Sequence, residues 1–233
     1  MARFTVLYSH GNAEDIGRVS QILMQRIAKW EADVFMYDYS GYGLSGGRPS
    51  ESNVYMDVEA AYDYLTIVLG VDPNTIVAFG RSIGSGPTIH IALHRKVLGV
   101  VLQSPVASVY RVKISRVPCT IPGDIFRNID KVNKLRVPTL ILHGTKDEVI
   151  PLSASQKMAL KIQEVYCRWI KGAGHNDMDG PYAVYADQAL QEFYEKIMPL
   201  IPRTLLRRGV WTSSTEPKNI WEANKGCLSI ENS

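Results

Sequence analysis

The chain has 233 residues, of which 45% are hydrophobic, and a formal net charge of +3. A chain of this length and composition can bury one sizeable core, so we expect one globular domain rather than two. A charge this close to neutral, without a Lys/Arg stripe interleaved with aromatic residues, argues against a nucleic-acid partner.

Strand-like and helix-like segments alternate along most of the chain. Short runs rich in β-branched, aromatic and other apolar residues predict strands at 4–9, 33–39, 75–80, 98–104, 138–144 and 165–170. Between and after them, helical segments are predicted at 14–30, 50–68, 83–94, 153–164 and 182–198. This alternation is typical of an α/β fold, a mostly parallel sheet with helices on both faces.

Two segments fall outside this alternation. Residues 105–137 contain prolines and no long periodic run, and they come where a lid could cover a site, so we expect at most a short lid. Residues 203–233 are rich in Ser, Thr, Asn, Lys and Glu, a composition typical of disorder. We therefore divide the chain into one folded domain at 1–202 and a polar, disordered C-terminal tail at 203–233.

A Gly-x-Ser-x-Gly pentad places Ser82 between Gly80 and Gly84. Serine and glycine are common in turns, so the pattern alone is a modest signal. Here it directly follows a predicted strand and directly precedes a predicted helix, the context in which a sharp turn exposes a nucleophilic serine hydroxyl. The two glycines then let the strand and the helix pass close to each other. We predict that Ser82 is a catalytic nucleophile.

The serine hydroxyl needs a base, and in this architecture the order along the chain is Ser, then Asp or Glu, then His. Asp147 follows the strand at 138–144, and His175 follows the strand at 165–170. The carboxyl ends of parallel strands share one edge of the sheet, so we expect both side chains near Ser82. Asp177 is the competing acid, but it lies only two residues from His175 and is poorly placed to orient that ring.

Two backbone amides are expected to stabilise the oxyanion of a tetrahedral intermediate. In this architecture one comes from the residue after the nucleophile, here Ile83, and the other from a loop after an early strand. We assign the second amide to Asn12, in the loop after the first strand, with Ala13 as a close alternative.

The remaining histidines and the glycine-rich run carry no separate chemistry in this interpretation. His90 and His94 fall on the helix behind Ser82 and are expected to pack or to face solvent, and His143 is expected to stabilise a turn. No cysteine or histidine spacing is typical of a metal site, so we predict no metal. The run at 38–47 lacks the Gly-Lys-Ser/Thr ending of a phosphate-binding loop, so we predict no cofactor and interpret it as a loop lining the site.

Three features bear on location. The longest apolar runs are far too short to cross a bilayer, and the N-terminal segment lacks the features of a signal peptide. Cys119, Cys167 and Cys227 are widely spaced and odd in number, which favours free thiols in a reducing compartment. We therefore expect a soluble, cytoplasmic protein. The basic cluster at 111–116 is more typical of a solvated face than of a contact with a membrane or an acidic partner.

Six segments together resemble the alpha/beta-hydrolase superfamily, and in particular its domain 17 group of protein depalmitoylases: SHGNAEDIG, YDYSGYGLSGG, GRSIGSGPT, RNIDKVNKL, HGTKDEVI and GAGHND. The resemblance covers roughly residues 4–198. It implies that Ser82 is the nucleophile, Asp147 the acid and His175 the base. It also implies hydrolysis of palmitoyl thioesters on membrane-associated proteins, at the cytoplasmic face of membranes.

The chain also departs from that group. Its members carry a palmitoylated N-terminal cysteine cluster and two strands before the HGN loop, whereas this chain begins almost at the third strand. Peripheral membrane contact therefore cannot be carried over from the resemblance. The alternatives are a general carboxylesterase or serine peptidase of the same superfamily, or a non-catalytic hydrolase-like binding protein. The presence of Ser82, Asp147 and His175 together argues against the last of these.

Overall fold

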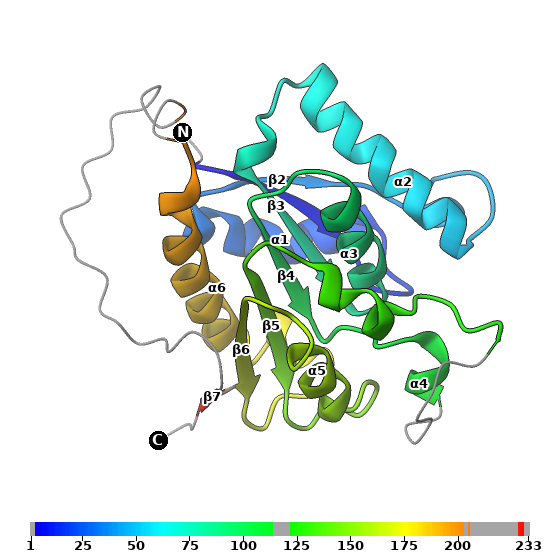
Figure 1. Ribbon diagram of the computed structural model, residues 1–233, viewed down its shortest axis with the longest axis vertical. Coiled ribbons are helices and arrows are strands. Elements are labelled where there is room, and N and C mark those ends of the chain that lie inside the picture. Colours follow the sequence, from blue (N-terminus) through cyan, green and yellow to red (C-terminus); the bar gives the residue numbers. More distant parts are fainter. Residues whose placement is uncertain (1–2, 114–121, 203–204, 206–227, 231–233) are drawn as a thin grey trace.

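One parallel sheet organises the molecule, seen in a computed structural model that describes residues 3–113, 122–202, 205 and 228–230 (Figure 1). Its strand order is β2-β1-β3-β4-β5-β6-β7, and every neighbouring pair is parallel. The strands are β1 (Thr5–Ser9), β2 (Asp33–Met36), β3 (Ile76–Arg81), β4 (Gly99–Gln103), β5 (Thr139–Gly144), β6 (Val165–Ile170) and β7 (Leu228–Ile230). The α/β class expected from the alternating segments is confirmed.

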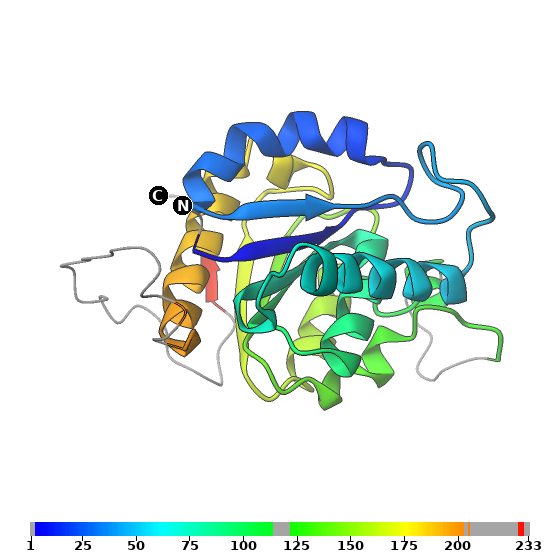
Figure 2. The same ribbon diagram turned by 90° about the horizontal axis from the view of Figure 1, so that it is seen from above.

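Helices cover both faces of this sheet. They are α1 (Ile16–Trp30), α2 (Glu51–Asp63), α3 (Ser85–His94), α4 (Val109–Lys113), α5 (Leu152–Ala159) and α6 (Ala183–Ile197). Residues of α1 and α6 pack into one core cluster, and residues of α2, α3 and α5 pack into another. Figure 2 shows α1 on one side of the sheet and α2 and α3 on the other. Strands β1, β3, β4 and β5 are buried along their whole length, which explains their continuous apolar sequences.

Local sequence signals account for the helix starts. The Asp15 side chain accepts a hydrogen bond from the Arg18 amide and so begins α1, and Ser50 does the same for α2 through the Asn53 amide. The helical segment after α2 continues as a π-helical turn at Tyr64–Val68. Together these two pieces span the predicted helix at 50–68.

The second strand is shorter than the sequence predicts. Its expected range was 33–39, but β2 ends at Met36. Within the described residues it is an edge strand with β1 as its sole partner, and Met36 pairs with Tyr8, one residue before β1 ends. Because the partner strand runs out there, residues 37–39 leave the sheet and enter the loop at its carboxyl edge.

The structure bears on two expectations about the C-terminal half, the disordered tail at 203–233 and the free cysteine thiols. Residues 228–230 form β7, paired with β6, instead of the disordered segment expected there, while most of 203–233 lies outside the described residues. Cys167 is disulfide-bonded, so the expectation of a free thiol at this position is wrong. Spacing along a sequence does not report which thiols a fold brings together. Cys119 and Cys227 lie outside the described residues.

The sheet places three loops at one edge. Ser82 directly follows β3, Asp147 lies in the loop after β5, and His175 lies in the loop after β6. Since these strands are parallel, their carboxyl ends meet at the same edge, which is where ligands bind in open α/β sheets. In the described part of the chain, none of the helices has the length and apolar character needed to span a bilayer.

Candidate active site

The turn after β3 holds Ser82 in a conformation that few residues adopt. Its φ is +54°, in the left-handed region, which costs a non-glycine residue roughly 1–2 kcal/mol. A short 3-10 turn, Ser82–Gly84, leads from it directly into α3. Strained backbone of this kind persists where the surrounding structure fixes it, and it is common at functional sites.

The two glycines of the pentad make this turn possible. A Cβ on Gly80 would lie 2.4 Å from the Gly84 carbonyl oxygen and from Thr88 Oγ1, so strand and helix could not pass so closely. A Cβ on Gly84 would lie 2.1 Å from the carbonyl oxygen of Ser9, at the end of β1. The predicted role of both glycines as space-saving residues is confirmed.

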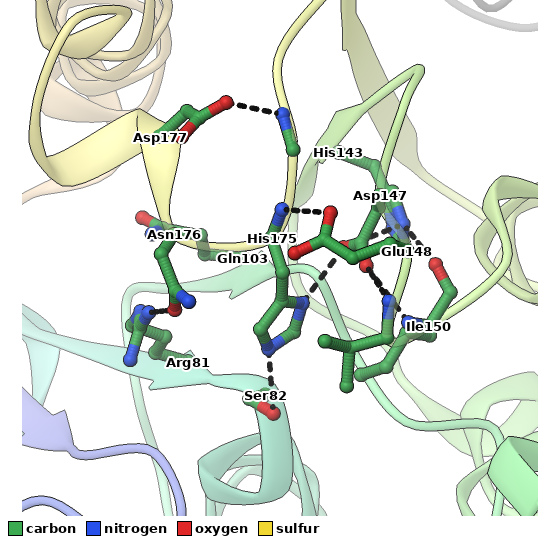
Figure 3. A network of polar contacts seen from close by, with 12 residues as sticks. Arg81, Ser82, Gln103, His143, Asp147, Glu148, Ile150, His175, Asn176 and Asp177 are labelled. Carbon is green, nitrogen blue, oxygen red and sulfur yellow. Dashed lines mark hydrogen bonds and ion pairs between the residues drawn. The ribbon is translucent and has the colours of Figure 1, made fainter.

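Three side chains from three loops form one chain of hydrogen bonds (Figure 3). His175 Nε2 lies 3.2 Å from Ser82 Oγ, and His175 Nδ1 lies 2.8 Å from Asp147 Oδ2. A carboxylate only accepts, so Nδ1 carries a hydrogen and Nε2 of the neutral ring is free to accept the serine proton. The three residues predicted from the sequence are thus brought together in the arrangement that serine activation requires.

Hydrogen bonds hold the Asp147 carboxylate in its ionised form. Its side chain is fully buried, and Oδ1 accepts from the amides of Val149 and Ile150 at 2.9 and 2.7 Å. Burial raises the pKa of Asp147, but hydrogen bonds from His143, from His175 and from the Ile150 amide outweigh burial and hold the pKa well below its usual range. A permanently charged acceptor therefore faces the His175 ring.

The competing carboxylate, Asp177, has a different task. Its Oδ2 accepts from the Gly174 amide at 2.7 Å, which closes the loop that carries His175. Within the described part of the chain, the His175 ring forms its hydrogen bond with Asp147 and not with Asp177 (Figure 3). A third carboxylate, Glu148, accepts from the His175 amide at 3.3 Å, a contact that the sequence did not suggest. Two neighbouring acids thus shape the histidine loop while Asp147 contacts the imidazole.

The acid loop and the histidine loop are also tied to each other through their backbones. The Lys146 amide donates to the Ala173 carbonyl at 2.9 Å, and the Gly172 amide donates to Thr145 Oγ1 at 2.9 Å. A Cβ on Gly144 would lie 2.3 Å from the Ala173 carbonyl oxygen, so only glycine allows this approach. These contacts fix the distance between Asp147 and His175.

The two candidate oxyanion amides belong to the turn after β3 and to the loop after β1, and their role stays a prediction. Ile83 follows Ser82 at the start of the 3-10 turn, where amides lack intrahelical partners. Asn12 lies in the loop after β1, and no hydrogen bond between described residues uses its amide, nor that of Ala13. The structure therefore keeps Asn12 and Ala13 as alternatives for the second donor.

The glycine-rich loop at 38–47 supports this region, as its predicted position implies. Tyr42 OH donates to Asn12 Oδ1 at 2.7 Å, and Tyr39 OH donates to the His10 carbonyl at 2.8 Å. The Asp38 carboxylate accepts from the Ile16 amide at 2.9 Å and so also anchors the start of α1. The loop after β2 therefore holds the loop after β1 in place.

A buried ion network around Arg81 was not anticipated from the sequence. Arg81 ends β3, is 6% exposed and forms ion pairs with Glu14 and Asp179. Its Nη2 also donates to Asn176 Oδ1 at 2.6 Å. Burial lowers the pKa of Arg81, but the carboxylates of Asp179 and Glu14 outweigh it and hold the pKa above its ordinary value. One guanidinium thus joins the loop after β1, the nucleophile strand and the loop after β6.

The same network extends away from the site. Asp179 Oδ1 also accepts from Arg26 Nη1 of α1 at 2.7 Å, and Arg26 Nε donates to Asp187 Oδ1 of α6 at 2.7 Å. Glu14 Oε2 accepts from the Gly11 amide at 2.7 Å, within the candidate oxyanion loop. The sequence signal for this network was an arginine at the end of an otherwise apolar buried strand, since such a charge needs partners.

The other sequence expectations have mixed outcomes. His90 stacks on Tyr55 at 4.3 Å and lies 2.8 Å from Glu59 Oε1, so its packing role is confirmed. His143 contacts Asp147 and is therefore more than a turn residue.

The lid segment includes α4, but residues 114–121 lie outside the described residues, so a short lid stays a prediction. Among the described residues, no group of three or more His, Cys, Asp or Glu side chains is arranged to hold a metal ion.

Sequence comparison finds similar proteins over most of the chain. A family profile described as "Serine aminopeptidase, S33" matches residues 1–127. The chain is 41% identical over 199 residues to alpha/beta hydrolase domain-containing protein 17C of Xenopus tropicalis, covering 85% of this chain and 64% of that protein. It is 38% identical over 200 residues to human alpha/beta hydrolase domain-containing protein 17B, covering 85% of this chain and 69% of that protein. The chain thus spans between 60% and 64% of the length of the 17C relatives it matches.

Solved structures share the fold. One is Est1E of Butyrivibrio proteoclasticus, solved with ferulic acid, with a TM-score of 0.69 and 18% identity, covering 84% of this chain and 90% of that one. Another is a monoacylglycerol lipase of Paleococcus ferrophilus, with a TM-score of 0.60 and 19% identity, covering 81% of this chain and 94% of that one. At this identity the likeness shows the fold alone.

Replacing Arg81 by methionine should destabilise the fold strongly. The change leaves the mostly buried Glu14 carboxylate without the guanidinium it pairs with and removes one of the two cations paired with Asp179, and breaking a buried pair in this way costs about 3–5 kcal/mol. The control is Arg127→Met, because Arg127 pairs with Asp130 at the surface and exposed pairs contribute about 0–1 kcal/mol. Urea unfolding at pH 7 measures both. If the free energy of unfolding of Arg81→Met lies within 1 kcal/mol of that of the unsubstituted chain, the Arg81 network does not stabilise the fold.

Replacing Asp147 by asparagine should slow the reaction of Ser82 with a fluorophosphonate probe by two orders of magnitude or more. The same change in a serine protease triad costs about 10⁴-fold, because the histidine loses its correct tautomer and its charged partner. Asp177→Asn is the matched control and should change the rate by less than about tenfold, since Asp177 contacts a backbone amide. The opposite ranking of the two variants would assign the acid role to Asp177.

Proposed function

Because the chain belongs to the alpha/beta-hydrolase family, in the group of the domain-containing proteins 17B and 17C, we propose that it is a serine hydrolase that cleaves long-chain acyl thioesters on proteins. The observation that carries the proposal is the hydrogen-bonded chain from Asp147 through His175 to Ser82. This arrangement activates a hydroxyl for attack on an acyl carbonyl.

The proposed reaction has two halves. In the first, Ser82 Oγ attacks the thioester carbonyl while His175 Nε2 takes its proton, and the amides of Ile83 and Asn12 bind the oxyanion. The carbon–sulfur bond then breaks and the thiol leaves with the proton from His175. In the second half, water loses a proton to His175, attacks the acyl-enzyme and releases the fatty acid, which restores the Ser82 hydroxyl.

An apolar cluster next to the nucleophile supports a fatty acyl substrate. It consists of buried side chains from several loops and helices around the carboxyl edge: Tyr39, Val54, Val106, Phe126 and Ile150. Tyr42, Ile83 and Val112 pack against it and are only partly buried. Ile83 directly follows Ser82, so an acyl chain leaving the reacting carbon can lie along this surface and lose its contact with water.

The substrate partners and the location belong to the same proposal. We assign palmitoylated proteins as substrates and the cytoplasmic face of membranes as the place of action. Exposed apolar side chains on loops support contact with a lipid surface, because Leu44 is fully exposed and Ile125 and Val149 are partly exposed. Leu44 lies in the loop after β2 and Val149 two residues after Asp147, both at the carboxyl edge of the sheet.

An aminopeptidase is the second candidate, since the matching family profile carries that description. An aminopeptidase needs a free acidic group to bind the substrate's amino terminus. The carboxylates around His175 are already engaged, because Asp177 binds the Gly174 amide and Glu148 binds the His175 amide. The carboxylate of Glu14 is paired with Arg81. These contacts favour an acyl ester or thioester over a peptide with a free amino terminus.

The unsubstituted chain should react with a fluorophosphonate probe on a single serine, and Ser82→Ala should abolish this labelling. The reason is that Ser82 is the hydroxyl bonded to His175 Nε2. Ser85→Ala is the control: Ser85 is also buried, but its hydroxyl donates to the Ser82 carbonyl rather than to a base. Labelling is measured by intact-protein mass spectrometry. Undiminished labelling of Ser82→Ala would contradict the assignment of the nucleophile.

The efficiency kcat/KM should rise with acyl-chain length by at least about two orders of magnitude between acetyl and dodecanoyl thioesters. Each buried methylene contributes about 0.8 kcal/mol, so even partial burial of the chain gives this factor. Val112→Ser should weaken the preference, whereas Val68→Ser, an exposed valine on the turn after α2, should leave it unchanged. Equal efficiency for all chain lengths would favour a general carboxylesterase.

A further inference from the structure

His143 lies directly behind the acid of the candidate triad. It is the penultimate residue of β5, fully buried, and four residues before Asp147. Its Nε2 lies 3.2 Å from Asp147 Oδ2, the same oxygen that accepts from His175 Nδ1. Figure 3 shows the three side chains in sequence, His143 on one side of the carboxylate and His175 on the other. The catalytic scheme uses His175 and leaves this second buried histidine without a role.

The neighbours of His143 determine where its hydrogen lies. Nε2 has two contacts, Asp147 Oδ2 and the Ile150 carbonyl oxygen at 3.0 Å, and both groups are acceptors only. A buried nitrogen between two acceptors must carry a hydrogen. Nδ1 lies 2.7 Å from the hydroxyl of buried Ser155, which can donate to it. The hydrogen on Nε2 therefore lies between the Ile150 carbonyl oxygen, with which Nε2 forms a hydrogen bond, and the Asp147 carboxylate.

We infer that His143 is a positioning residue for Asp147, acting on the triad through the shared oxygen Oδ2. The inference rests on the proposed serine hydrolase function. With His143 in place, Oδ1 accepts from the Val149 and Ile150 amides, and Oδ2 accepts from His175 and lies 3.2 Å from the hydrogen-bearing Nε2 of His143. The carboxylate plane is thereby fixed, and with it the direction of the hydrogen bond to His175.

The contact of His143 with Asp147 Oδ2 should also affect how the reaction rate depends on pH. A carboxylate that loses one donor carries more uncompensated negative charge, so it holds the proton of a charged His175 ring more tightly. Four groups lie around His175 and the Asp147 carboxylate: Asp147 itself and His143 from β5 and the loop after it, Ser155 from α5, and Glu148 at the His175 amide. Removing the His143 donor should therefore move the acid limb of the pH–rate profile to higher pH.

Three variants separate positioning from packing. His143→Phe keeps a ring of similar size and removes the donor. His143→Gln keeps an amide N–H that can reach the carboxylate. Ser155→Ala is the matched control, since it alters the same buried pocket at Nδ1 and leaves the Nε2–H donor in place.

The first measurement is the second-order rate of fluorophosphonate labelling between pH 5 and 9. For His143→Phe we expect the midpoint of the acid limb to rise by about 0.5 to 1 pH unit and the plateau rate to fall up to about 100-fold. In His143→Gln both the midpoint and the plateau rate should return most of the way to the values of the unsubstituted chain. In Ser155→Ala neither should change. An unshifted midpoint in His143→Phe, or an equal shift in Ser155→Ala, would overturn the inference.

The second measurement is histidine ¹⁵N NMR on the unsubstituted chain, and it needs neither catalysis nor a folded variant. We expect a protonated Nε2 on His143 that exchanges slowly with solvent. A resonance showing Nε2 of His143 without a hydrogen would refute the inference whatever the variants do. If the unsubstituted chain is not labelled at all, the proposed function fails, while the NMR result still decides whether Nε2 of His143 carries the hydrogen that a donor to Asp147 needs.

Discussion

The close packing of the start of α3 against the end of β1 is the constraint on which the site depends. It requires glycine at position 84, where a Cβ would overlap the Ser9 carbonyl, and it requires Ser82 to adopt a left-handed φ. With both in place, the turn at 82–84 lies against the end of β1, and the Ser82 hydroxyl reaches His175. The strain at Ser82 is thus offset by the packing of the sheet and helices on both sides of the turn.

Ion pairs and backbone contacts then hold the remaining loops against this turn. Arg81 joins the loop after β1 to the histidine loop through Glu14 and Asn176, and the acid loop is joined to the histidine loop through the Lys146 amide. Arg81 is buried and the Glu14 side chain is mostly buried, so breaking their ion pair would leave a charge without its partner. Contacts between four separate loops therefore hold Ser82, His175 and Asp147 in one arrangement, as proton transfer from Ser82 to His175 requires.

The sequence predicted the parts of this arrangement that are encoded locally. The Gly-x-Ser-x-Gly pentad between a strand and a helix indicated Ser82, and the positions of Asp147 and His175 after later strands indicated their common edge. No sequence pattern predicted the contacts between loops that are distant in the chain. The Arg81 network joins residues as far apart in the chain as Arg26 and Asp187, which are 161 positions apart. The role of His143 depends on the path of the chain around Ile150, and the end of β2 depends on where its partner strand stops. Each of these is set by the tertiary fold rather than by spacing along the chain.

The proposed reaction passes through an acyl group on Ser82, so the decisive experiment is to trap that group. The chain would be mixed with a palmitoyl thioester, quenched within a fraction of the turnover time and digested for mass spectrometry. We predict a palmitoyl adduct on the peptide that contains Ser82, because the attack of Ser82 transfers the acyl group to the enzyme before water releases it. Turnover of the thioester without any adduct, or with the adduct on a residue other than Ser82, would contradict the account.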